Sequence, residues 1–263
     1  MKPIPALLTL LALSLLPVGA QSQKLDGLKD QLKSSTGRDR NLGGSGSEWF
    51  WIDLFFNFGF WPTYGLLFGF ENEPSARWVD FNDFPYADGN NGLYLPTDWP
   101  GRGTRTQVTA HLQTNEDAVL GGYAQVRFSP NRYLTFDLNH LQLFELLEDQ
   151  PDDRFAISNF NVQVNRVRHP KIHLWWGGGL MLLHSDELYG SPALSGGFTW
   201  FFKKPLSLHA ETQFGRPNGV FARQHQARVQ YHLDRFMFYA GYQGFKVGEI
   251  GIPSWTMGSG IWF

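Results

Sequence analysis

The chain has 263 residues, carries a formal net charge of −2 and contains 10 Trp and 23 Phe, yet its mean hydropathy is only −0.28. A charge this close to zero gives no reason to expect binding to nucleic acid. The aromatic content exceeds what a soluble core needs, whereas the mean hydropathy is too low for a helical membrane protein. A transmembrane β-barrel reconciles the two values, because it encloses polar residues and exposes aromatic residues at two membrane interfaces.

The first 20 residues have the features of a secretory signal peptide. Lys2 supplies the positive start, residues 7–16 form a short apolar core, and small residues precede an expected cleavage after Ala20. The apolar core is too short for a membrane anchor, and Pro17 interrupts its end. We therefore expect export through the inner membrane. The sequence contains no Cys, which excludes disulfides, thiolate metal sites and a lipoprotein acylation site.

Residues 21–47 are rich in Gly, Ser, Lys and Asp and contain little apolar material to offset the entropy lost on folding. This composition predicts a flexible periplasmic leader. Leu25, Leu28 and Leu32 nevertheless fall at helical spacing, so a short helix over residues 24–33 is an open alternative.

Residues 48–102 predict an aromatic, membrane-proximal segment and a turn-rich loop outside the barrel. The even positions from 50 to 60 are all apolar, which fits a strand, while Asp53 and Asn57 lie one turn apart, which fits an interfacial helix. The long loop that follows favours a helix or an irregular segment, since periplasmic connections in barrels are short. An envelope protein, if one binds the chain, is expected to contact this segment.

From residue 103 to residue 263 the sequence predicts an all-β, antiparallel transmembrane barrel of about ten strands, with eight or twelve as alternatives. Each expected strand has the length needed to cross a bilayer at a tilt. Short turns, three of them with Pro, alternate with longer acidic loops, which is the asymmetry of such barrels. The expected strands are 103–114, 118–129, 131–146, 153–168, 171–184, 190–203, 205–215, 220–233, 235–247 and 253–263.

The last expected strand alternates an apolar row, from Trp255 to Phe263, with a row of small residues, and it ends on an aromatic residue. In this feature the region from about residue 103 to residue 263 resembles the bacterial outer-membrane β-barrel proteins. The resemblance implies location in the outer membrane, contact with its lipid, and recognition of the terminal strand by the barrel assembly machinery. Phe263 would then be part of the assembly signal.

Aromatic residues gather near the expected short turns and the C-terminus, which predicts an interfacial girdle. Its expected members are Phe128, Tyr133, Trp175, Trp200, Phe202, Tyr231, Phe236 and Trp262.

Alternation also assigns a lumen, in which both signs of charge occur among many amides. The expected lumenal charged residues are Arg105, Arg127, Asp137, Glu211 and Arg228. Isolated charges in a narrow lumen would be costly, so we expect an ion-pair and hydrogen-bond network that fills the bore. The apolar strand 171–184 receives no inward assignment.

His209 and Glu211 alternate on one expected strand and are the weak candidates for a general-base pair. The structural alternative, in which both belong to the lumenal network, is favoured. Barrel enzymes such as the phospholipase and lipid A deacylase barrels place Ser and His at the outer rim, but Ser158 has no histidine near it in the sequence. The Asp and Asn residues between 80 and 91 are explained by turns. We assign no metal site and no cofactor.

Three functions remain open at this point. The first is a structural, adhesive or partner-anchoring barrel with a filled lumen. The second is a small pore for solutes or ions. The third is an enzyme that hydrolyses lipids or peptides at the membrane surface.

Overall fold

The computed structural model describes residues 24–34, 78–89, 92–96, 101–115, 119–145 and 153–263. The expected signal peptide (1–20) and the aromatic row of residues 50–60 lie outside these residues.

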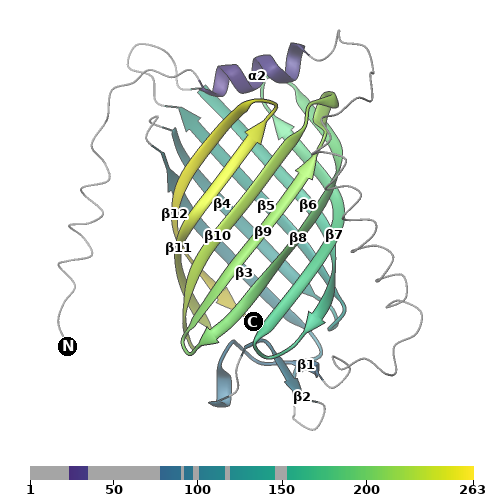
Figure 1. Cartoon of the computed structure of the whole chain (residues 1–263), viewed down its shortest axis with the longest axis vertical. Coiled ribbons are helices and arrows are strands. Elements are labelled where there is room, and N and C mark those ends of the chain that lie inside the picture. The colour runs from purple at the N-terminus through teal and green to yellow at the C-terminus, as the bar shows by residue number, and fades with distance from the viewer. Residues whose placement is uncertain (1–23, 35–77, 90–91, 97–100, 116–118, 146–152) are drawn as a thin grey trace, which may run out of the picture.

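Ten strands form a closed antiparallel barrel, which confirms the predicted fold class and strand number (Figure 1). Each strand pairs with its neighbours along the chain, and the last strand pairs with the first to close the ring. The predicted boundaries lie within three residues of those observed. The strands are β3 Arg105–Thr114, β4 Val119–Ser129, β5 Leu134–Glu145, β6 Asp153–Arg168, β7 Ile172–His184, β8 Leu188–Lys203, β9 Leu206–Gly215, β10 Ala222–Leu233, β11 Phe236–Val247 and β12 Ile250–Trp262.

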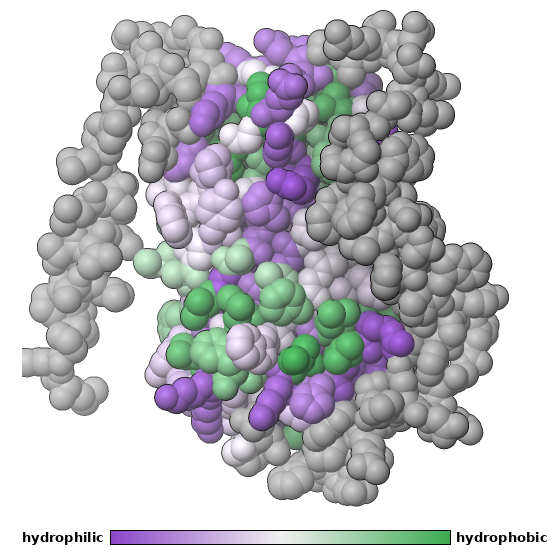
Figure 2. Space-filling model, viewed as in Figure 1, coloured by the Kyte–Doolittle hydropathy of each residue, from purple (hydrophilic) through white to green (hydrophobic). Residues whose placement is uncertain are grey.

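The two faces of the wall have opposite polarity, in the reverse sense to a soluble protein. On β10, Gln226 and Arg228 are buried inside, while Val229 on the other face is 50% exposed. On β3, Leu112 is 75% exposed. Such an arrangement is stable where the outer face meets lipid rather than water. On the face shown in Figure 2, hydrophobic side chains gather toward the end that carries the short turns.

The aromatic girdle is present near the short turns, with two corrections. Phe128, Phe202 and Phe236 are 42%, 43% and 54% exposed on the outer face. Trp175 and Trp262, which we expected in the girdle, are instead buried inside the barrel. Their nearness to turns was a weaker guide than strand alternation, which places each on the lumenal face of its strand.

Helix α2 (Lys24–Ser34) lies across the mouth at which the longer loops meet (Figure 1). Leu25, Leu28 and Leu32 are fully buried there, in a cluster with residues from the upper parts of the barrel wall. The backbone N–H groups of Lys24 and Leu25 each donate to the Glu145 carboxylate at 2.9 Å. A carboxylate in this position satisfies N–H groups that a helix leaves unpaired at its start.

Of the two alternatives left open for residues 24–33, a flexible leader or a short helix, the structure has the helix. The three leucines form one apolar stripe, and the mouth supplies an apolar surface to cover it, so burial offsets the entropy cost. The helix lies at the mouth opposite the C-terminus.

The other mouth is covered by a two-stranded sheet of β1 (Trp78–Phe81) and β2 (Tyr94–Pro96), with a short 3₁₀ turn, η4 (Ala87–Gly89), between them. A second apolar cluster joins this sheet to the barrel through Phe81, Tyr94 and Trp262. The Tyr86 hydroxyl donates to the backbone oxygen of Leu206 at 2.5 Å. Both mouths are therefore covered by segments that precede the barrel in the sequence.

Candidate functional site

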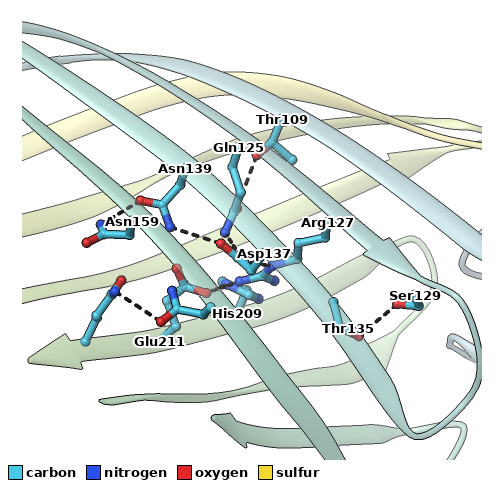
Figure 3. A network of polar contacts seen from close by, with 12 residues as sticks. Thr109, Gln125, Arg127, Ser129, Thr135, Asp137, Asn139, Asn159, His209 and Glu211 are labelled. Carbon is cyan, nitrogen blue, oxygen red and sulfur yellow. Dashed lines mark hydrogen bonds and ion pairs between the residues drawn. The ribbon is translucent and has the colours of Figure 1, made fainter. Parts of the chain in front are cut away.

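Three charged side chains meet in the middle of the lumen (Figure 3). Arg127 on β4 pairs directly across the sheet with Asp137 on β5, and its Nε lies 2.7 Å from a carboxylate oxygen of Asp137. The same guanidinium reaches across the bore and donates through Nη2 to Glu211 on β9. A single arginine thus ties two opposite parts of the wall together.

Amide side chains extend this centre around the lumen. Asp137 also accepts hydrogen bonds from Gln125 at 2.7 Å and Asn139 at 3.0 Å. Asn159 donates to Asn139 at 2.7 Å. On the far side, Gln226 donates to Glu211 at 2.5 Å. Buried carboxylates that accept this many hydrogen bonds have their polar atoms satisfied within the protein.

The expected base pair of His209 and Glu211 is adjacent but lies within this network. His209 Nε2 is 3.5 Å from Glu211, its Nδ1 is 3.0 Å from the Thr199 hydroxyl, and its ring stacks on Trp175. The enclosed cavity that His209 lines has a volume of about 20 Å³. Such a space holds about one water molecule and no substrate. Both residues thus lie inside the lumenal network, beside a space too small for a substrate.

The other two arginines assigned to the network rest on aromatic rings, and Arg228 pairs across the sheet with His209. Arg105 is near the mouth covered by β1 and β2, where its guanidinium lies over Phe81 at 4.4 Å and Trp262 at 5.0 Å. Arg228 lies over the ring of Tyr239 at 4.5 Å. Both are buried, and each rests on an aromatic face, which is a favourable place for a cation.

Phe263 completes the closure of the ring. Its backbone N–H donates to Thr106 at 2.9 Å, and its backbone oxygen accepts from the Thr106 N–H at 3.2 Å. Its side chain is 50% exposed. The terminal residue thus helps to join the last strand to the first.

A further polar cluster, which the sequence did not reveal, lies on the outer face of the wall. Ser158 on β6 lies 2.9 Å from His140 Nδ1 and 3.2 Å from His184 Nε2. Strand alternation alone places Ser158 and His140 on the outer face. Only the pairing register brings them together, because Ser158 is directly opposite His140 in the sheet.

Within the described residues, no group of three or more His, Asp or Glu side chains has the arrangement of a metal site. No helix among the described residues is long and apolar enough to cross a membrane.

No family model matches the sequence, and no curated protein matches it. Solved structures with a similar fold include the N-terminal β-barrel domain of OprF from Pseudomonas aeruginosa, at 10% identity and a TM-score of 0.33, covering 60% of this chain and 97% of that one. Neisserial surface protein A is 12% identical with a TM-score of 0.32, over 61% and 96% of the two chains. The attachment invasion locus protein Ail of Yersinia pestis is 13% identical with a TM-score of 0.30, over 61% and 96%. The fold class of this chain is established by its own strand pairing.

Proposed function

We propose that the protein is a sealed barrel of the bacterial outer membrane that anchors its own N-terminal region at the membrane and does not conduct. The observation that carries this proposal is the Arg127–Asp137–Glu211 centre, which bridges the bore from one wall to the other. Ten strands also lie near the size at which side chains fill the interior, far below the sixteen or more strands of porins.

The outer face supports the membrane location. Large apolar side chains are exposed on nine of the ten strands, all except β9, and outward aromatic residues gather near the short turns. Exposed apolar surface of this extent would be unfavourable in water, whereas it matches the hydrocarbon of a bilayer. Because the C-terminus and the short turns share one mouth, we place that mouth in the periplasm and α2 at the cell surface.

The anchoring role follows from how the N-terminal region is held. Helix α2 is fixed at one mouth through Leu25, Leu28 and Leu32, and the β1–β2 sheet is fixed at the other through Phe81 and Tyr94. The chain is thereby attached to the barrel on both sides of the membrane. We propose that any envelope partner contacts residues 48–102, whose β1–β2 sheet lies at the mouth that we place in the periplasm, and that the assembly machinery recognises the terminal strand.

Cysteine labelling on intact cells tests this topology, and the absence of native Cys makes each introduced thiol unique. A membrane-impermeant maleimide is expected to label Asp186→Cys, in the loop near α2, on intact cells. Arg235→Cys, in a short turn, is expected to react only after the outer membrane is permeabilised. Leu138→Cys, which is 56% exposed on the lipid face, serves as the membrane control and is expected to stay unlabelled in both conditions. Labelling of Arg235→Cys on intact cells would reverse the proposed orientation.

A further inference from the structure

The outer face of the wall carries a serine held between two imidazole rings. Ser158 Oγ lies 2.9 Å from His140 Nδ1 and 3.2 Å from His184 Nε2. The three residues come from the adjacent strands β5, β6 and β7 of a closed sheet. A site built on paired strands is held more rigidly than one built on loops.

The proton inventory of the cluster gives the two histidines different roles. A serine hydroxyl has one proton to donate and can accept further hydrogen bonds. Ser158 therefore donates to one imidazole and accepts an N–H from the other. We assign the acceptor role to His140, which is the nearer ring, and the donor role to His184. A hydroxyl within hydrogen-bond reach of an acceptor imidazole is the arrangement of an activated serine nucleophile.

The cluster lies on the outer face where polar positions begin to alternate with apolar ones. On one side of it along their strands, Leu138 and Phe160 are 56% and 45% exposed. On the other side, toward the mouth covered by α2, the outward positions of β5 are Gln142 and Phe144, and those of β6 are Ala156 and Arg154. In a bilayer, the ester bonds of lipids lie where the apolar region gives way to the polar one.

A groove of about 580 Å³ on the outer face reaches His140 from the opposite side to Ser158. Its floor includes Ala110, Gly122 and Ala124, and its sides include Leu112 and Met257. The register explains why it ends at the cluster, since His140 pairs with Ala124 and Ala124 pairs with Ala110. This volume lies within the range of about 300–1,000 Å³ that is typical of ligand sites. An open apolar groove beside a nucleophile suits an acyl chain.

We propose that Ser158, His140 and His184 hydrolyse acyl esters of membrane lipids, with the acyl chain held in this groove. Ser158 Oγ attacks the ester carbonyl carbon while its proton passes to His140 Nδ1, and the carbonyl electron pair moves to oxygen. The imidazole N–H of His184 is a hydrogen-bond donor next to the reacting atoms. Collapse of the intermediate expels the alcohol, which takes the proton from His140. Water then attacks the acyl-serine, gives a proton to His140 and releases the fatty acid, and Oγ recovers the proton.

Two assays on the folded protein in mixed micelles test the proposal. The first measures fatty-acid release from a phospholipid with a fluorescent acyl chain, and the second locates covalent labelling by a fluorophosphonate through mass spectrometry. We expect hydrolysis by the unmodified protein and labelling at Ser158. Ser158→Ala is expected to abolish both, and His140→Gln to lower hydrolysis by about 100-fold or more, the usual contribution of a general base. Retention of heat-modifiable migration on gels shows that each variant is folded.

Matched variants distinguish the loss of a catalytic group from a general effect of substitutions on the outer face of the barrel. His225→Gln removes another outward histidine, on β10, and is expected to keep full hydrolysis. Gly122→Leu places a side chain in the groove, where an added Cβ meets no atom within 4 Å. It is expected to lower lipid hydrolysis while Ser158 still reacts with the fluorophosphonate. Ala227→Leu adds the same side chain to the outer face of β10 as its control. Absence of hydrolysis in the unmodified protein, or its survival in Ser158→Ala, would overturn the proposal.

Discussion

Replacing Glu211 by Ala tests whether the lumen is held by its central charge network. The substitution removes the carboxylate that accepts from Arg127 and Gln226, and it leaves His209 without its acidic neighbour. Removal of one partner from a buried ion pair costs about 3–5 kcal/mol. Arg127 keeps its bond to Asp137 and its place over Trp175. We therefore expect the lower end, about 3 kcal/mol.

Reversible urea unfolding of the protein in lipid vesicles, followed by Trp fluorescence, measures this loss. Glu211→Gln is the matched control, because it keeps an acceptor oxygen and the volume while it removes the charge, and we expect a smaller loss. A double-mutant cycle of Glu211→Ala with Arg127→Met isolates the pair, and a coupling of at least about 1 kcal/mol is expected. Unchanged stability of Glu211→Ala would show that the network does not support the barrel.

Three further predictions concern the helix and the terminal strand. Leu28→Ala should weaken docking of α2 by about 2–4 kcal/mol, since Leu28 is fully buried. Hydrogen exchange of the helix amides measures this loss, and unchanged protection from exchange would contradict the docking. Burial and the neighbouring Asp153 raise the pKa of Asp26, so docking of α2 should weaken as the pH rises through that pKa. Asp26→Asn should therefore increase the protection of α2 against hydrogen exchange at neutral pH. Equal protection in both proteins would refute this. Phe263→Asp should lower the amount in the outer membrane by more than its apolar burial of about 2–3 kcal/mol implies, as measured by cell fractionation; a normal amount would remove Phe263 from the assembly signal.

Most strands could be predicted because each has a single lipid-facing row, so the two-residue period of the sheet is visible in the sequence. The strand over 171–184 is apolar in both rows, and its inward face could not be assigned. The same period places Arg127, Asp137 and Glu211 on the inner face. It cannot say which of them touch, because Arg127 and Glu211 lie 84 residues apart and meet only when the ring closes. Alternation places Arg228 on the inner face as well, but it cannot show that Arg228 rests on Tyr239 while Arg127 forms the ion pairs.

Two features depended on contacts that no local pattern contains. The stripe of leucines in α2 was visible, but the apolar mouth that covers it is assembled from strands far apart in the sequence. Ser158 and His140 are 18 residues apart, and a shift of one residue in the pairing of β5 with β6 would separate them. Register is set by the whole closed sheet, so the outer cluster becomes visible only in the structure.

Single-channel recording in planar lipid bilayers tests the central claim, that the barrel is sealed, most directly. The unmodified protein is expected to insert without steady ion conductance, because the Arg127–Asp137–Glu211 centre and its amides fill the bore and both mouths are covered. Heat-modifiable migration of the same sample confirms that folded barrels were added. Stable openings of porin-like size in the unmodified protein would contradict the sealed barrel.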